Sequence, residues 1–326
     1  MHFHTPTGVV RAVDGVSFSL DAGGTLAIVG ESGSGKTVTV LTMMGLVPKP
    51  PGKIEGGTAL FRGRDLLRLA PDEIRQIRGK EIAMIFQDPL TALNPVHRVG
   101  NQIIEAIRAH DDVSKAVAKR RAIELLGTVG IPNPQKRVDG YPHEFSGGMR
   151  QRAMIAMALS LKPKILIADE PTTALDVTVQ AQILELLKAL QRDFGMALIM
   201  ITHDLGVVAQ VADEILVMYA GRMVERGSPQ GIFYRPQHPY TWGLLGSIPR
   251  LGQEDDRLVS IAGMPPSLMR VPPGCPFHPR CVFRFDLCDK ERPELEMRDE
   301  HEDACYLDLE AKARGRGELL GERVTT

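Results

Sequence analysis

The chain has 326 residues, of which 43% are hydrophobic and 24% charged, and this ordinary globular composition excludes an intrinsically disordered protein. Its 39 Lys and Arg residues nearly balance its 40 Asp and Glu residues, which argues against a protein that holds nucleic acid mainly through phosphates. No apolar run approaches the roughly 18 residues that span a bilayer. The start also lacks the basic-then-apolar pattern of a signal peptide. We therefore expect a soluble intracellular protein.

The N-terminal part of the chain is predicted to form strands around a glycine-rich loop. Segments 9–20 and 25–29 are rich in β-branched residues, and segment 54–61 is a further strand candidate. A helix is expected to begin at Lys36, directly after the loop, and to end at about Leu46, before a proline.

The segment from about 90 to 161 is predicted to be a helical subdomain. Ile103 and Ile107 share one helical face, Ser114 is a plausible N-cap, and the apolar stripe that follows stops at Gly130. From residue 164 onward, short apolar runs at 165–168, 196–201 and 215–218 alternate with a helical stripe at 179–190. This alternation predicts a parallel sheet covered by helices, with functional residues at the C-terminal ends of its strands.

After about residue 228 the composition and the periodicity of the sequence change. Proline and glycine become frequent and the hydrophobic periodicity fades, so we expect a small, loop-rich appendage. The charged end, 310–326, is predicted to be frayed.

A phosphate-binding loop is predicted at residues 30–37. The segment fits the pattern G-x-x-x-x-G-K-[ST] between a strand and a helix, the context that defines a P-loop. Its backbone N–H groups should surround the β-phosphate of a nucleotide, and the helix N-terminus adds a partial positive charge. We expect Lys36 to reach the β- and γ-phosphates and Thr37 to bind Mg²⁺. The other residues expected to contact the nucleotide are Gly30, Ser32, Gly33, Ser34 and Gly35.

Two acidic residues close the apolar run 165–168. Asp169 is expected to hold Mg²⁺ through water, and Glu170 is expected to polarise the water that attacks the nucleotide. A helix N-cap after a strand is the simpler interpretation of such a pair, but beside a P-loop the catalytic interpretation is favoured.

A second anion site is predicted at residues 145–152. Here a serine cap and two glycines precede a helical stretch, so free N–H groups and a hydroxyl converge at a helix start. One chain thus carries two phosphate-binding helix ends, which suits a nucleotide held between two copies.

Together these motifs resemble the ATP-binding subunit of an ABC transporter. Six elements occur in family order: the P-loop, Gln87 in a Q-loop, the signature at 146–151, Asp169-Glu170, the D-loop Ala174-Leu175-Asp176, and the switch histidine His203. The resemblance implies a RecA-like α/β core with an antiparallel β part, a helical subdomain and a small C-terminal appendage. The nucleotide-binding domain should span 1–227 and the C-terminal region 228–326.

The resemblance also implies a role for each motif residue. Gln87 contacts the Mg²⁺ and attacking-water region and senses the membrane subunits, and His203 contacts the γ-phosphate. Asp176 bridges the two ATPase subunits. The signature residues that serve the nucleotide bound on the opposite subunit are Ser146, Gly147, Gly148 and Gln151. Phe3 is the candidate for stacking on adenine, with an ordinary edge residue as its alternative; the short strand that usually precedes this aromatic is trimmed or missing here.

Segments 86–95 and 237–241 narrow the resemblance to the importer subfamily for dipeptides, oligopeptides and nickel. It implies ATP and Mg²⁺ as cofactors and a place on the cytoplasmic face of the cell membrane. Its implied partners are a paralogous ATPase, two permease subunits and an extracytoplasmic binding protein, with no nucleic acid. A nickel importer differs in cargo only, and the sequence cannot name the cargo. A DNA-maintenance ABC ATPase would need long coiled coils between Gln87 and Ser146, where only 58 residues lie.

Four cysteines, Cys275, Cys281, Cys288 and Cys305, form a candidate metal site in the C-terminal region. In a reducing compartment, metal binding is favoured over disulfides. The spacing lacks the paired knuckles of structural zinc, and four thiolates suit an iron–sulfur cluster. Some peptide importer ATPases carry a [4Fe–4S] cluster on a similar region; zinc and unligated thiols are the alternatives. We expect the ATP site to be independent of these cysteines, because its residues end at His203.

Overall fold

A computed structural model describes residues 1–173, 175–248, 261–298 and 301–321. They form two compact units. The first comprises Met1–Ser19, Leu26–Leu67 and the described residues after 201; the second comprises Leu20–Thr25 and Arg68–Ile201. The phosphate loop and the cysteines therefore share one unit. The predicted helical subdomain lies in the other, and the expected domain division after residue 227 stays a prediction.

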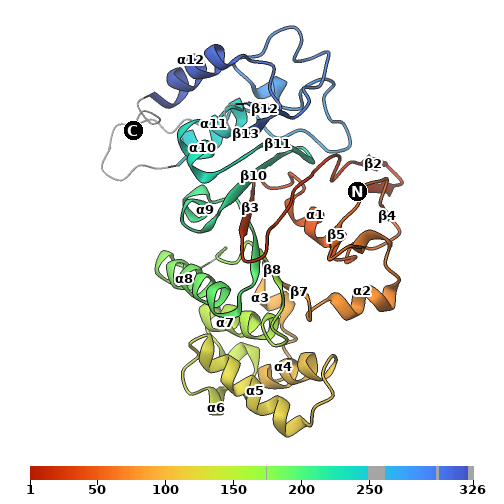
Figure 1. The fold of residues 1–326 in the computed structure, drawn as a ribbon, viewed down its shortest axis with the longest axis vertical. Coiled ribbons are helices and arrows are strands. Elements are labelled where there is room, and N and C mark those ends of the chain that lie inside the picture. The colour runs from red at the N-terminus through yellow and green to blue at the C-terminus, as the bar shows by residue number, and fades with distance from the viewer. Residues whose placement is uncertain (174, 249–260, 299–300, 322–326) are drawn as a thin grey trace. The chain divides into compact units, whose positions relative to one another are not determined.

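The first unit is built on a sheet with the strand order β12-β13-β11-β10-β3 (Figure 1). Strands β3 (Thr25–Val29) and β10 (Glu214–Tyr219) are parallel, as expected from their apolar runs. Strand β11 (Arg222–Gly227) returns antiparallel to β10, and β13 (His301–Asp303) and β12 (Glu296–Arg298) extend the sheet antiparallel. The P-loop thus follows a fully buried strand.

Two small sheets occupy the rest of the N-terminal part. Strand β1 (His2–Thr5) lies between β2 (Gly8–Val10) and β4 (Gly52–Lys53), and β5 (Leu60–Phe61) pairs with β6 (Arg64–Asp65). The expected strands at 9–20 and 54–61 were wrong in extent. Residues after Val10 do not continue the ladder, because their N–H groups bond to distant carbonyls: that of Arg11 to Leu268 and that of Asp14 to Gly221.

Helices of the first unit include several at the two ends of the C-terminal region, whose described residues 261–295 are mainly loop, as predicted. They are α1 (Lys36–Met43), η1 (Leu66–Arg68), α9 (Leu205–Val211), α10 (Pro229–Tyr234), α11 (Pro239–Gly246), η3 (His278–Arg280) and α12 (Leu309–Leu320). Helices α11 and α12 pack side by side (Figure 1). Asp308 caps α12, so the described part of the C-terminal tail is helical; residues 322–326 lie outside the described residues.

A buried polar network fastens the C-terminal region to β11. The Glu225 carboxylate is fully buried and accepts hydrogen bonds from the N–H groups of Gln237 (2.6 Å) and His238 (3.0 Å). It also lies 2.8 Å from Nε2 of His301. Both oxygens of this carboxylate therefore have hydrogen-bond partners, and a charged group can be buried only when it is paired in this way.

The second unit is built on three parallel strands in the order β9-β8-β7. These are β7 (Ile82–Ile85), β8 (Ile165–Asp169) and β9 (Ala197–Thr202). Helix α8 (Val177–Phe194) joins β8 to β9 and ends at Gly195, whose φ of 60° is the left-handed conformation that glycine adopts readily. The predicted strand-helix-strand pattern is confirmed.

The expected helical segment is confirmed. Its helices are α3 (Pro89–Ala92), α4 (Val99–Arg108), α5 (Lys115–Thr128), α6 (Pro134–Arg137), η2 (Pro142–Glu144) and α7 (Gly147–Ala158), with α2 (Pro71–Ile77) preceding β7. Ile103 and Ile107 are fully buried. Ser114 caps α5 by accepting the N–H of Val117. Among the described residues, no helix is long and apolar enough to cross a membrane.

The buried network predicts a pH dependence of stability. Burial lowers the pKa of His238 from 6.5 to about 4, against an opposing effect of Glu225 and with a further lowering by Lys312. As the pH falls from 6.5 to 4, the unfolded chain binds a proton at His238 that the folded chain does not, so the free energy of unfolding should fall by about 3 kcal/mol. Nδ1 of His238 also accepts the Tyr240 N–H at the start of α11. Asn can make the same cap.

The His238→Asn variant removes the titrating ring and keeps a capping oxygen. Urea denaturation at several pH values should show a smaller loss of stability between pH 6.5 and 4 than in the parent chain. Equal pH slopes in the two proteins would show that His238 does not cause the loss.

Candidate functional site

The phosphate loop between β3 and α1 needs glycine at two positions. Gly30 and Gly35 have φ values of 147° and 102°, and Gly33, which has open space around it, has a φ of 79°. A Cβ atom at Gly30 would lie 2.2 Å from the Met218 carbonyl oxygen, and one at Gly35 would lie 2.3 Å from that of Ala12. Side chains are thus excluded by both conformation and space.

Three side chains of the loop are suited to phosphate binding. Lys36 is 5% exposed, and its Nζ donates to the carbonyl oxygens of Gly30 (2.8 Å) and Glu31 (3.0 Å), which curls the loop around the ammonium. Ser34 Oγ is buried and has no hydrogen-bond partner among the described residues. Thr37 is half-buried in the first turn of α1. A buried hydroxyl normally has a hydrogen-bond partner, and a phosphate oxygen would supply one for Ser34 Oγ.

The acidic pair lies in the second unit, at the end of β8. Asp169 is 2% exposed, while Glu170 adopts a left-handed conformation with φ of 47°. Its N–H donates to the carbonyl of Ile201 on the neighbouring strand (2.8 Å). A strained backbone at this point is typical of a functional residue that its surroundings hold in place.

Gln87 and Glu170 are brought together, as their shared expected role requires. Gln87 follows β7, and its Nε2 donates to Glu170 Oε2 at 3.0 Å. The hydroxyl of Thr173 donates to the same oxygen at 2.9 Å. Thr173 was not among the predicted site residues; its position three residues after Glu170 was the only sequence signal for it. These two donors orient the carboxylate.

The signature motif starts helix α7. Ser146 and Gly147 are exposed, and Ser146 Oγ accepts the N–H of Met149 as N-cap at 3.4 Å. A Cβ atom at Gly148 would lie 3.0 Å from Val179, so the glycine permits close packing against α8. Gln151 is 2% exposed, and its Nε2 is buried without a partner among the described residues. The cap is exposed, and the binding of phosphate at this helix end stays a prediction.

The remaining predicted residues lie at element ends or in strands. Asp176 is exposed and caps α8 by accepting the Val179 N–H at 2.9 Å. Its D-loop neighbour Ala174 lies outside the described residues. His203 is exposed directly after β9, in the first unit. Phe3 is half-buried in β1, opposite Val10. The structure does not test their roles, which stay predictions.

The four cysteines converge on one small cavity of about 20 Å³ in the first unit. All are half-buried free thiols. Burial, with a smaller contribution from neighbouring thiols, raises the pKa of Cys281 to about 11 and of Cys305 to about 12. Over the described ranges, however, no group of three or more His, Cys, Asp or Glu side chains is arranged to hold a metal ion. The predicted iron–sulfur cluster is not supported by this arrangement.

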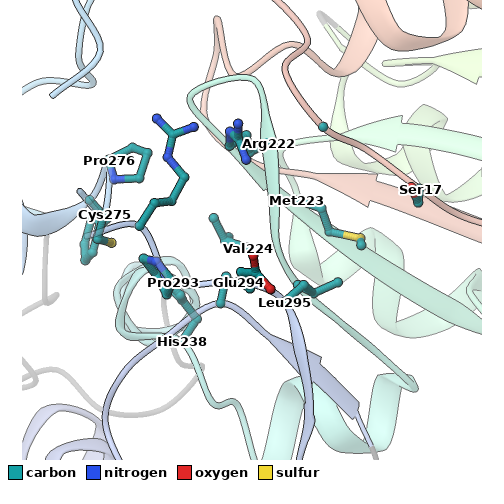
Figure 2. A pocket seen from close by; sticks show the side chains of 14 residues that line it. Ser17, Arg222, Met223, Val224, His238, Cys275, Pro276, Pro293, Glu294 and Leu295 are labelled. Atoms are coloured by element: carbon teal, nitrogen blue, oxygen red, sulfur yellow. The ribbon is translucent and has the colours of Figure 1, made fainter. Parts of the chain in front are cut away.

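A larger cavity of about 340 Å³ lies beside the cysteines. Figure 2 shows its lining, with Met223 and Val224 on β11 and with Cys275 and Pro293 on C-terminal segments. No residue of the phosphate loop lines it. The sequence did not predict this cavity, because its walls come from segments far apart in the chain.

Comparisons with known proteins agree with these features. A family model described as ABC transporter matches residues 13–173, and one described as oligopeptide/dipeptide transporter, C-terminal region, matches residues 224–288. The chain is 56% identical over 306 residues to the dipeptide transport ATP-binding protein DppD of Bacillus subtilis (strain 168), covering 94% of this chain and 91% of that protein. It is 53% identical over 308 residues to the oligopeptide transport ATP-binding protein OppD of Escherichia coli (strain K12), covering 94% and 91%.

The chain belongs to the ABC transporter family of ATP-binding proteins. The family resemblance found in the sequence is thereby confirmed. A solved structure of the ATP-binding cassette MJ0796, dimeric and bound to ADP and Pi, is similar with a TM-score of 0.63 at 26% identity. The match covers 70% of this chain and 95% of the cassette, so the expected P-loop ABC fold is confirmed as well. This ABC protein is an ATPase.

Glu170→Gln tests whether Glu170 is the catalytic carboxylate of this ABC ATPase. The amide keeps the shape of the side chain but cannot take a proton from water, so we expect steady-state ATP hydrolysis to fall about 10²- to 10⁴-fold while ATP still binds. Glu185→Gln is the matched control, because Glu185 lies exposed on α8. Near-normal turnover in Glu170→Gln would remove Glu170 from the catalytic role.

Proposed function

We propose that this ABC ATPase powers the uptake of peptides through a binding-protein-dependent importer. The observation that carries the proposal is the likeness to DppD and OppD, which exceeds 50% identity over more than nine tenths of both chains. The separate match of residues 224–288 to the C-terminal region of oligopeptide/dipeptide transporters supports it, because that region lies beyond the general ABC match.

Three kinds of partner follow from this proposal. Two permease subunits and an extracytoplasmic binding protein would provide the path and the peptide specificity, and this chain would bind peripherally on the cytoplasmic face of the membrane. A paralogous ATPase would complete a dimer with two ATP sites.

The short helices α3 to α6, of 4 to 14 residues, leave no coiled coil between Gln87 and the signature, which argues against a role in DNA maintenance.

We propose the following chemistry for the nucleotide site. The P-loop binds the phosphates of ATP, with Lys36 neutralising their charge. Thr37, Gln87 and Asp169 would hold Mg²⁺, which would neutralise phosphate charge, and Glu170 would accept a proton from the attacking water. His203 contacts the γ-phosphate. The signature of the partner subunit closes the site, and Asp176 links the two subunits.

Uptake by membrane vesicles tests the cargo. Vesicles from cells that produce the complete transporter should accumulate labelled di- or oligopeptides when ATP is supplied, and vesicles with Glu170→Gln should not. Accumulation of nickel without peptide would instead identify nickel as the cargo. The mutant controls for transport by other systems.

A pair of variants tests the two-subunit site. Lys36→Ala should weaken nucleotide binding by the isolated chain or abolish turnover, because Lys36 serves its own nucleotide. Ser146→Arg should leave that binding largely intact while turnover of the assembled transporter is lost, because Ser146 serves the nucleotide of the partner. Fluorescent-nucleotide titration measures binding. Equal loss of binding in both isolated variants would contradict the shared site.

For the cysteines we propose a thiolate-ligated [4Fe–4S] cluster. The support is the resemblance stated above; the four cysteines line one cavity, although their side chains are not arranged there to hold a metal ion among the described residues. Purified without oxygen, the protein should be brown, with absorption at about 400 nm and roughly four iron and four sulfide per chain. Serine at any of the four positions should lower that content, because oxygen is a poorer ligand for this soft site. A colourless preparation with one zinc per chain would contradict the cluster and favour zinc.

A further inference from the structure

Glu31, inside the phosphate loop, is held from two directions by the C-terminal region. Arg280 forms a two-pronged ion pair with its carboxylate, with Nη1–Oε2 at 2.6 Å and Nη2–Oε1 at 2.9 Å. The backbone N–H of the same Glu31 donates to the hydroxyl of Tyr240 at 2.7 Å. Residues 240 and 280 therefore fix both the side chain and the main chain of one loop residue.

The ion pair is sheltered from solvent. The Arg280 side chain is 5% exposed and that of Glu31 is 26% exposed. The guanidinium also lies 5.9 Å from the ring centre of Tyr219 and 6.0 Å from that of Phe277, within the range of cation–π attraction. The hydrogen bonds that Arg280 donates to the Glu31 carboxylate raise the pKa of Arg280 above its ordinary value, so the guanidinium stays protonated. Screening by salt is weak in such a setting.

Both gripping residues are themselves anchored. Arg280 ends the short helix η3, and its Nε donates to the Ala262 carbonyl at 3.0 Å. Tyr240 lies fully buried in α11, whose start is fixed because His238 caps it and is in turn bound by Glu225. Both residues that bond to Glu31 are therefore held in place by further hydrogen bonds of their own.

We propose that Arg280 and Tyr240 are positioning residues for ATP binding. Tyr240 fixes the main chain of the loop at Glu31, and Arg280 neutralises a carboxylate that sits among the residues cradling the ATP phosphates. Without Arg280, an unpaired negative charge would face a polyanionic ligand and would itself be left partly desolvated. This role goes beyond ATP hydrolysis as such, and it depends neither on the transported cargo nor on whether the cysteines bind a metal.

A double-mutant cycle on the full chain tests the charge effect. Arg280→Met should weaken binding of a fluorescent ATP analogue about ten- to hundredfold, the effect typical of losing hydrogen bonds between charged groups. Glu31→Gln should weaken it less, because the amide carries no charge. The double variant should bind more tightly than Arg280→Met alone, since it leaves no unpaired carboxylate. In steady-state hydrolysis, KM for ATP should rise more than kcat falls.

Matched controls separate this role from general destabilisation. Arg284→Met alters an exposed arginine four residues further along the chain and should leave ATP affinity unchanged. Tyr240→Phe should weaken binding more than Tyr234→Phe, because only Tyr240 bonds to the loop. If thermal unfolding shows that Arg280→Met does not fold, Arg280→Lys is measured as a single variant instead. The lysine keeps the charge but loses the two-pronged geometry, so a smaller loss of ATP affinity is expected.

Two outcomes would overturn the proposal. One is parental ATP affinity in Arg280→Met or, if that variant does not fold, in Arg280→Lys. The other is a Glu31→Gln, Arg280→Met double variant that binds ATP no better than Arg280→Met alone. Peptide uptake is not measured in this cycle, so failure here leaves the proposed transport function intact, and failure of peptide uptake leaves this result standing.

Discussion

Close backbone contact around the phosphate loop is the constraint on which the rest of the first unit depends. Gly30 lies against the carbonyl of Met218 at the end of β10, and Gly35 lies against that of Ala12. Ser34 adds a carbonyl that accepts the Gly221 N–H at 2.9 Å. The loop can therefore curl around Lys36 only if the turn after β10 and the segment near residue 12 are in place. This explains why residues 11–14 leave the ladder of β2 and form long-range hydrogen bonds.

Strand β11, which pairs with β10, connects the phosphate-loop region to the C-terminal region. Strand β11 presents the buried carboxylate of Glu225 to the segment that begins α11. A second buried pair, Lys312 with Asp303 at 2.7 Å, fastens α12 to β13. Buried charges are tolerated only in well-defined arrangements, since losing one partner leaves the other uncompensated. Such pairs therefore disfavour other placements of the C-terminal strands and helices. Apolar contacts alone would discriminate less between these placements.

Local patterns in the sequence were sufficient for the motifs and for the elements that carry them. The start of α1 at Lys36, the end of β8 at Asp169 and the cap at Ser114 each follow from residues within one turn or one strand. The pairing of Gln87 with Glu170 was expected only from the family resemblance, because the two residues are 83 positions apart.

Other features could not be read from local patterns. The C-terminal helices α10, α11 and α12 were missed because proline and glycine mask a short helical period, although Ser228, His238 and Asp308 cap them. The unpredicted strands β12 and β13 are three residues each; β13 pairs with β11, which precedes it by about 70 positions, and β12 pairs with β13. Their stability thus comes from tertiary pairing, for which no periodicity in 296–303 gives a signal.

Separation along the chain is a poor measure of independence between two sites. The cysteines begin 72 positions after His203, and on that ground the nucleotide site was expected not to depend on them. The structure shows a shorter route, because Arg280 directly precedes Cys281 and bonds to Glu31 across 249 positions. Any change that displaces the backbone at Cys281 must also move the guanidinium or break its fork. The phosphate loop and the segment that carries Cys281 are therefore linked through Arg280, whatever the thiols bind.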